Sequence, residues 1–215
     1  MCGVSAPVDN SVHRWAKSSR NSVQNRLGLK IRSAWTGADD TFALLADGNV
    51  DLIVSVIAEG TAALRWEPLY TERYVVAMRS QHPARRGFSF DKWLRYPHIV
   101  VSGRGQTAGS LDAVLASKGK ARRVAMVVPS FLAVPRIVAD SDLLALVPES
   151  LMATGPYPGV VVCEPPVAVP SFEVGVAWHA RRDHDAASMH VVRLLVEMSK
   201  NDGRLRRLRR ARTAS

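Results

Sequence analysis

The sequence predicts an α/β fold built on mostly parallel sheets. Apolar segments of strand length alternate with helical stretches of about ten residues, and this alternation is typical of strands joined by crossover helices. The run at 50–57 is continuously apolar, which suits a strand covered on both faces. Hydrophobic residues make up 47% of the chain, so a packed core is expected.

The expected elements begin after residue 26, because residues 1–26 show no sustained hydrophobic period and read as irregular or weakly helical. Strands are expected at 29–35, 50–57, 64–70, 73–78, 98–101, 124–128, 143–147, 160–163 and 173–178. Helices are expected after Asp39, and at 90–95, 110–117, 131–139, 149–153 and 183–200.

Glycine and proline residues that end helices or strands support several of these boundaries. Gly48 is placed to end the first helix in a left-handed turn. His82-Pro83 breaks the chain after the strand at 73–78, and Pro148 stops the strand at 143–147. The last helix is amphipathic, and the side chains expected to face inward are Met189, Val192, Leu195, Val196 and Met198.

The positive charge of the chain lies at its ends. The formal net charge is +10, yet residues 199–215 alone contain seven basic residues and one acidic residue, and residues 1–26 contain four and one. The middle is therefore nearly neutral, and the basic segment 201–215 is expected to be a disordered, solvated tail. Two cysteines, no apolar stretch of about 18 residues and no signal peptide indicate a cytoplasmic protein without disulfides or membrane contact.

A family resemblance emerges from six motifs that follow one another in order. The first is the segment from Leu45 to Ile53, which has the form L-x-x-G-x-x-D. It is followed by Trp66-Glu67-Pro68-Leu69, Tyr74-Val75-Val76 with Gln81-His82-Pro83, Val128-Pro129-Ser130-Phe131-Leu132, the segment 142–148, and Phe172 through Arg181. Over residues 27–198 the chain resembles the effector-binding domain of LysR-type transcriptional regulators, in the branch of salicylate-responsive and nodulation regulators.

The resemblance implies a two-lobed type 2 periplasmic-binding-protein-like fold with a ligand held between the lobes. The expected division is lobe I at 27–79, lobe II at 80–170 and a return to lobe I at 171–200. The strands 73–78 and 173–178 are expected to connect the lobes. Members of the family begin with a helix-turn-helix, which we expect to be absent here, so DNA would be reached only through a missing domain. Lobe I is expected to be incomplete, without its central strand.

Seven residues are candidate ligand contacts because they lie at or near strand ends. They are Ser55, His98, Ser102, Gly103, Ser130, Phe131 and Gly175. The backbone N–H groups at Ser102-Gly103 precede a helix and could hold a carboxylate, or they could form only a turn with a helix cap. In the resembling branch a histidine at the position of His98 lines an aromatic-acid pocket, whereas the alternative is a buried, hydrogen-bonded histidine.

The other candidates also have structural alternatives. Ser130 could cap a helix while Phe131 supplies an aromatic wall, or the pair could be a cap and a core residue. Ser55 ends a strand at the expected ligand site. Gly175 could mark the close approach of a ligand or of another backbone segment.

The predicted function is therefore that of a noncatalytic domain that binds a small, possibly aromatic, carboxylate effector without a cofactor. It could pair with itself or with other LysR-type subunits. His179, His184 and His190 are not spaced as metal ligands, no G-x-S-x-G motif occurs, and Ser102 to Gly109 is not a dinucleotide fingerprint, so neither a metal site nor an enzyme is expected. Two alternatives remain: a solute-binding protein of the same fold and a nonfunctional regulator fragment.

Overall fold

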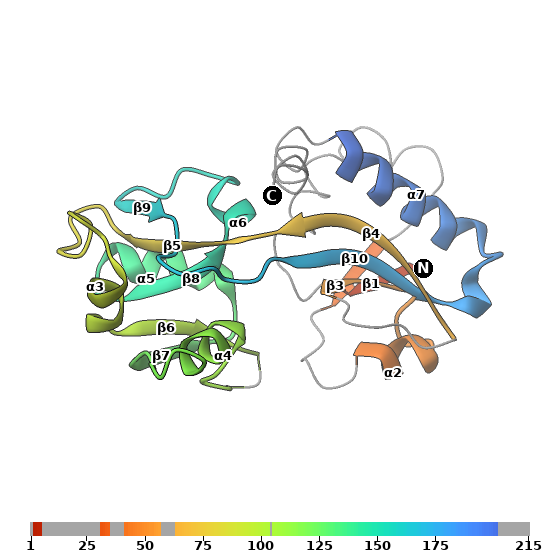
Figure 1. Cartoon of the computed structure of the whole chain (residues 1–215). Helices are drawn as coiled ribbons and strands as arrows, with labels where there is room; N and C mark the ends of the chain where they lie inside the picture. The colour runs from red at the N-terminus through yellow and green to blue at the C-terminus, as the bar shows by residue number, and fades with distance from the viewer. Residues whose placement is uncertain (1, 6–30, 35–40, 57–62, 104, 202–215) are drawn as a thin grey trace. The chain divides into compact units, whose positions relative to one another are not determined.

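The computed structural model describes residues 2–5, 31–34, 41–56, 63–103 and 105–201, which form two compact units (Figure 1). The first unit combines Met1–Thr71 with Phe172–Ser215, and the second is Glu72–Ser171. The chain thus leaves the first unit eight residues before the boundary expected after residue 79. Most of the segment 1–26 and the basic tail after residue 201 lie outside the described residues.

The first unit is built on a five-stranded sheet with the order β2-β1-β3-β10-β4. Its strands are β1 (Cys2–Ser5), β2 (Ile31–Ala34), β3 (Leu52–Val56), β4 (Leu64–Glu72) and β10 (Phe172–His179). Strand β1 runs parallel to β2 and β3, and β10 pairs antiparallel with β3. The helices are α2 (Thr41–Ala46), the 3-10 turn η2 (Ala180–Arg182) and α7 (Ala186–Asn201).

The expectation that this unit lacks its central strand is wrong. Strand β1 pairs Cys2 with Ile31 on one side and Val4 with Leu52 on the other, so the backbone groups at the centre of the sheet find partners. The strand was missed because it has only four residues, with the sequence CGVS. So short a segment, with a glycine and a serine in it, carries no hydrophobic period that a pattern could reveal.

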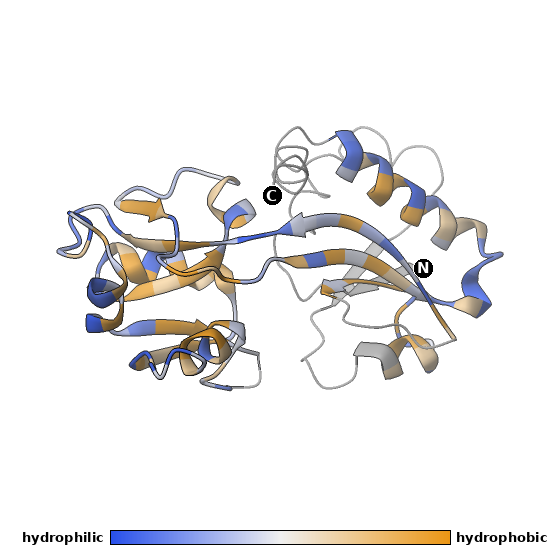
Figure 2. Cartoon of the chain, in the orientation of Figure 1, coloured by the Kyte–Doolittle hydropathy of each residue, from blue (hydrophilic) through white to orange (hydrophobic). Residues whose placement is uncertain are grey.

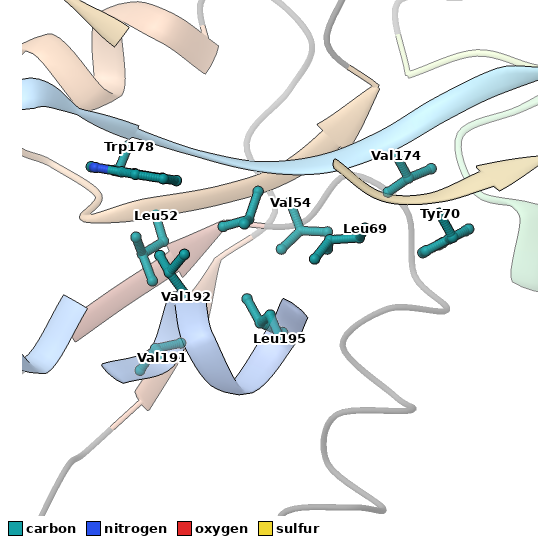
Figure 3. Close-up of a cluster of buried hydrophobic side chains, with 10 residues drawn as sticks. Leu52, Val54, Leu69, Tyr70, Val174, Trp178, Val191, Val192 and Leu195 are labelled. Atoms are coloured by element: carbon teal, nitrogen blue, oxygen red, sulfur yellow. The ribbon is translucent and has the colours of Figure 1, made fainter. Parts of the chain in front are cut away.

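Helix α7 packs on one face of this sheet through a single hydrophobic cluster (Figure 3). Val191, Val192 and Leu195 of the helix meet Leu52 and other apolar side chains of the sheet. The inward side of the last helix was therefore predicted correctly for Val192 and Leu195, and Met189 and Val196 also pack against this cluster. The helix begins three residues later than expected because Asp185 caps it, accepting a hydrogen bond from the Ser188 N–H at 3.1 Å.

The second unit repeats the five-strand design with the order β7-β6-β8-β5-β9. Its strands are β5 (Tyr74–Arg79), β6 (His98–Val101), β7 (Val124–Val128), β8 (Leu144–Pro148) and β9 (Val160–Cys163). Strand β6 is parallel to β7 and β8, whereas β5 is antiparallel to β8 and β9. Strands β5 and β10 each lie wholly within one sheet, so the lobe-connecting strands expected at 73–78 and 173–178 do not span both units.

Short helices cover both faces of the second sheet. They are α3 (Phe90–Arg95), α4 (Ser110–Ala116), the 3-10 turn η1 (Phe131–Ala133), α5 (Val134–Ala139) and α6 (Glu149–Met152). Trp93, Leu111 and Leu115 bring α3 and α4 onto one face. Val134 and Leu151 place α5 and α6 in the second cluster, on the other side of the alternating side chains of β5. Within the described ranges, every helix is too short or too polar to span a bilayer.

Candidate ligand-binding site

A pocket of about 250 Å³ opens at the carboxyl end of β6, entirely within the second unit. This end of a parallel strand is where ligands bind in many α/β folds. The pocket is lined by Tyr74, Ile99, Val100, Val101, Ser102, Gln106, Ala108, Gly109, Ser110, Leu111, Arg122, Phe131 and Leu146. The lining combines apolar side chains with polar groups that could orient a small molecule, and its exposed surface is more polar than apolar.

The loop after β6 forms one wall and is fixed by its own hydrogen bonds. The Ser102 N–H donates to the carbonyl oxygen of Val128 at 2.9 Å, which extends the pairing of β6 with β7 by one residue. The Ser102 hydroxyl oxygen accepts a hydrogen bond from the Gln106 N–H at 3.0 Å. Gly105 has a φ of +70°, a conformation that side-chain-bearing residues rarely adopt, so glycine permits this turn.

Arg122 supplies a buried positive charge to the pocket. Its side chain is 5% exposed and forms a two-point ion pair with Asp112, with Nε–Oδ1 at 2.9 Å and Nη2–Oδ2 at 2.7 Å. Its third nitrogen, Nη1, has no hydrogen bond within the part of the chain that the structure describes. The guanidinium is therefore held in a fixed orientation while one donor group stays unused.

The charge of Asp112 is secured by its partners. Burial alone would raise the pKa of this carboxyl group. The hydrogen bonds from Arg122 and from the Gly109 N–H, which lies 2.6 Å away, outweigh burial and hold the pKa below its usual value. The ion pair thus persists at neutral pH, and Arg122 does not need a ligand to be stable in the fold.

Two aromatic side chains contribute to the remaining lining. Burial, together with the nearby charge of Glu72, raises the pKa of Tyr74, so its hydroxyl group remains a neutral hydrogen-bond donor at pH 7. Phe131 begins η1 and packs partly against the hydrophobic cluster around Val128 and Val134. Ser130 caps η1 by accepting a hydrogen bond from the Leu132 N–H at 3.2 Å, which positions Phe131 at the pocket.

The structure brings two of the predicted contacts, Ser102 and Phe131, into this pocket. Ser130 acts through the cap just described, and Gly103 is exposed beside the pocket without lining it. Sequence reasoning missed Arg122 and Tyr74. Tyr74 lay in one of the recognised motifs, and a buried arginine could have been suspected from Arg122 directly before a strand, but no spacing tied it to Asp112 ten residues earlier.

His98 begins β6 and does not line the pocket, although the charges of Arg122 and Asp112 act on its pKa. The side chain is fully buried, its Nε2 atom is 3.0 Å from the carbonyl oxygen of Trp93, and its ring centroid lies 5.6 Å from that of Trp93. Burial lowers the pKa of His98 to about 4, so the ring is neutral at pH 7 and Nε2–H donates to Trp93. These contacts match the structural alternative given for this histidine.

Ser55 and Gly175 lie in the first unit, directly opposite each other on β3 and β10. A Cβ atom added to Gly175 would lie 2.0 Å from Nε1 of Trp66 and 2.8 Å from the Glu67 carbonyl oxygen. The close approach that this glycine permits is therefore that of the Trp66 ring and the β4 backbone. The Ser55 hydroxyl group makes a long 3.4 Å contact with the carbonyl oxygen of Val56.

A second pocket of about 470 Å³ lies in the same unit beside Arg73, Tyr74 and the segment 164–169. Arg73 is engaged there by Glu149 and by both carboxylate oxygens of Glu164, at 2.8 and 2.7 Å. These bonds fix the start of β5 to α6 and to the end of β9. The described part of the chain contains no group of three His, Cys, Asp or Glu side chains that could hold a metal ion.

Comparisons with known proteins agree with this architecture. The model of the LysR substrate binding domain matches residues 24–200. The HTH-type transcriptional activator NagR of Ralstonia sp. is 29% identical over 156 residues, which cover 72% of this chain and 52% of NagR. Nodulation protein D 1 of Bradyrhizobium elkanii is 27% identical over 169 residues, covering 77% of this chain and 54% of that protein. The chain spans about half the length of the curated relatives it matches.

Solved structures show the same fold. The probable transcriptional regulator PA0477 from Pseudomonas aeruginosa superposes with a TM-score of 0.74 at 23% identity, over 90% of this chain and 65% of that one. The effector binding domain of QuiR in complex with shikimate gives a TM-score of 0.67 at 15% identity, over 94% and 97%. The ordered motifs, the two repeated sheets and these matches lead to one assignment: the chain belongs to the LysR substrate binding domain family, in the branch of NagR and the nodulation regulators.

Proposed function

We propose that this chain is the effector-sensing part of a transcription regulator and that it binds a small carboxylate in the pocket at the end of β6. The observation that carries the proposal is the buried Arg122, which Asp112 orients and whose Nη1 atom makes no hydrogen bond to any residue that the structure describes, in a pocket that also offers apolar side chains. A carboxylate there would gain a charge-assisted hydrogen bond in surroundings of low dielectric constant.

The rest of the lining favours a ligand with a ring. Phe131 offers an aromatic surface, Tyr74 a hydroxyl group, and Ile99 to Val101 an apolar side. A volume of about 250 Å³ is small, which suits a single-ring acid. The related effector domain of QuiR holds shikimate, a cyclic carboxylate, and this supports the same ligand class here.

The relatives of this chain regulate transcription, and the proposed role is the same. A ligand shifts a regulator only if it binds one conformation more tightly than another. Within this proposal the working form is an oligomer with LysR-type subunits, located in the cytoplasm where transcription takes place in bacteria. Co-purification with a tagged full-length family member tests the pairing. A chain that stays monomeric with every such member would contradict it.

The ligand proposal is tested by titrating the purified chain with single-ring carboxylates such as salicylate, benzoate and shikimate. A ligand that binds only the native state raises the melting temperature, by an amount that grows with its concentration. The same ring compounds with an amide in place of the carboxylate should have no effect. If no carboxylate stabilises demonstrably folded protein at millimolar concentration, the proposal fails.

Variants then locate the site. Arg122→Met should weaken binding at least about tenfold, since a charge-assisted hydrogen bond contributes about 1.5–3 kcal/mol. Because this change leaves Asp112 unpaired, the double variant Arg122→Met with Asp112→Asn removes both charges and should also fail to bind. Arg136→Met is the matched control, since Arg136 is 91% exposed and pairs with the exposed Asp140 outside the pocket. Unchanged affinity in the folded double variant would exclude this pocket.

A further inference from the structure

The second unit has a strongly basic face near the start of β6. Four of its arginines are paired with acids: Arg73, Arg79, Arg122 and Arg136. The other lysines and arginines that the structure describes in this unit all belong to two segments, residues 85–95 and 118–123. We call the basic side chains of these two segments, apart from the pocket residue Arg122, the basic face.

The first segment carries Arg85, Arg86, Lys92 and Arg95 on α3 and the loop before it, and the second carries Lys118, Lys120 and Arg123. Asp91 is the one acid within the two segments. All seven basic side chains are exposed except the half-buried Lys92. None of them has an ion pair within the described residues. Arg85 and Lys92 donate hydrogen bonds to backbone carbonyl oxygens, which leaves their charges uncompensated.

Backbone contacts hold the two segments at the same end of the sheet. The His98 N–H donates to the carbonyl oxygen of Arg123 at 2.8 Å, which places Arg123 next to the start of β6. The His98 ring bonds to the Trp93 carbonyl oxygen, which ties α3 to that same strand end. Figure 1 shows α3 and the start of β6 together at this end of the unit, and Figure 2 shows hydrophilic residues in α3 beside its hydrophobic ones.

We propose that the basic face binds the phosphate backbone of duplex DNA without reading its sequence. Lysine and arginine side chains that neutralise phosphates release condensed counterions, and this release drives binding without any apolar contact. A protein partner would need an apolar centre to its interface. The large exposed hydrophobic side chains of the described chain are Val56, Met126, Leu132 and Val162, and none lies in either segment.

The proposal adds a DNA contact to the effector domain itself, whereas the sequence suggested that DNA is reached only through another domain. The face includes residues of α3 and lies beside the start of β6, and the other end of β6 borders the ligand pocket. A DNA contact here would add to the affinity of any separate DNA-binding element by raising its effective concentration at the duplex.

The test measures binding of the 215-residue chain to a fluorescent duplex of about 30 base pairs and arbitrary sequence between 20 and 200 mM NaCl, because affinity driven by counterion release falls steeply as salt rises. The variant Arg95→Gln, Lys118→Gln, Lys120→Gln and Arg123→Gln removes four exposed charges that make no ion pairs. We expect its affinity to fall at least about tenfold. If all four contact phosphate, the magnitude of the slope of log affinity against log salt should decrease by about 3.6, since each lost phosphate contact contributes roughly 0.9.

The basic sequence after residue 201 provides the matched control. Arg206→Gln, Arg207→Gln, Arg209→Gln and Arg210→Gln remove the same number of charges from that sequence and should weaken binding less than the face variant does. A folded face variant with wild-type affinity and salt dependence overturns the proposal, whatever the control does. So does the absence of DNA binding at 20 mM salt, or competition by polyglutamate as effective as competition by unlabelled duplex, which would indicate an acidic protein partner.

Discussion

The two sheets of this protein share one strand order and differ at the position where a ligand was expected. In the second unit, the end of β6 opens into a pocket beside Ser102 and Phe131. In the first unit, the predicted ligand contacts were Ser55 and Gly175. There the indole ring of Trp66 lies directly against the glycine. The comparison shows that a glycine in a strand can indicate that another group packs closely against the backbone. That group can be a side chain of the same protein rather than a ligand.

The largest expected effect on stability comes from adding a side chain at Gly175. Gly175→Ala places a methyl group against both the Trp66 ring and the Glu67 carbonyl oxygen, so the free energy of unfolding should fall by about 3 kcal/mol, as for an overpacked core. Urea denaturation measures this loss. Gly155→Ala is the control, because a Cβ atom there meets nothing within 4 Å, and it should change stability by less than about 0.5 kcal/mol.

The double variant Trp66→Ala with Gly175→Ala sharpens that test. If the Trp66 ring is the group that excludes a Cβ atom at residue 175, Gly175→Ala should lower the free energy of unfolding clearly less in the Trp66→Ala background than in the wild type. Equal costs in the two backgrounds would show that the backbone of β4, rather than the indole ring, sets the requirement for glycine.

The second prediction uses a buried group of the second unit. The pKa of His98 is about 4 in the folded chain, and that of an unfolded histidine is about 6.5. Between these values the unfolded state binds more protons, so stability should fall as the pH drops from 6.5 to 4, by roughly 3 kcal/mol in total. His98→Gln, which keeps a donor for Trp93, should flatten this dependence. Parallel curves for the two proteins would contradict the assignment.

The third prediction compares the two serines. Ser102→Ala removes the acceptor that fixes the loop after β6, so it should cost about 1 kcal/mol and weaken the proposed carboxylate binding. Ser55→Ala removes only a long contact with the neighbouring carbonyl oxygen and should be nearly neutral for both properties. Thermal unfolding with and without ligand measures the two variants side by side. Equal loss of affinity would restore Ser55 as a candidate contact.

The smallest effect concerns thiol reactivity. Burial, with a contribution from Glu164, raises the pKa of Cys163 to about 11, so little thiolate exists at pH 8. In a Cys2→Ser variant, Cys163 should react with a thiol reagent more than about tenfold more slowly than it does in denaturant. Similar rates in native and denatured protein would mean that the loop around β9 opens readily.

The sequence was sufficient to predict most of the second unit because its elements are marked by strong local signals. Helix α3 and strands β6, β7 and β9 have the predicted bounds, since Pro, Gly and Ser residues punctuate the apolar runs. Strand β1 could not be predicted, because its position comes from pairing with β2 and β3 rather than from its own four residues.

The candidate site was less predictable, because it depends on contacts between distant positions. Ser102 and Phe131 lie close to glycine and proline residues that indicate turns in the sequence. Arg122 is identifiable only through its pairing with Asp112 and its position in the pocket. His98 was weighed between two roles, and it is the packing against Trp93 that supports the structural one. Sequence motifs thus indicate where a site lies, whereas its charged residues can be identified only from the tertiary contacts.

The course of the chain through the two units also imposes an order on their assembly during synthesis. The second unit is one continuous stretch, Glu72–Ser171, and all its strands are synthesised before β10. Strand β10 then has to insert between β3 and β4, so the first sheet stays open at its middle until the last quarter of the chain is translated. A nascent chain therefore exposes unpaired strand edges of the first unit for longest, and that unit is where misfolding and chaperone binding should concentrate.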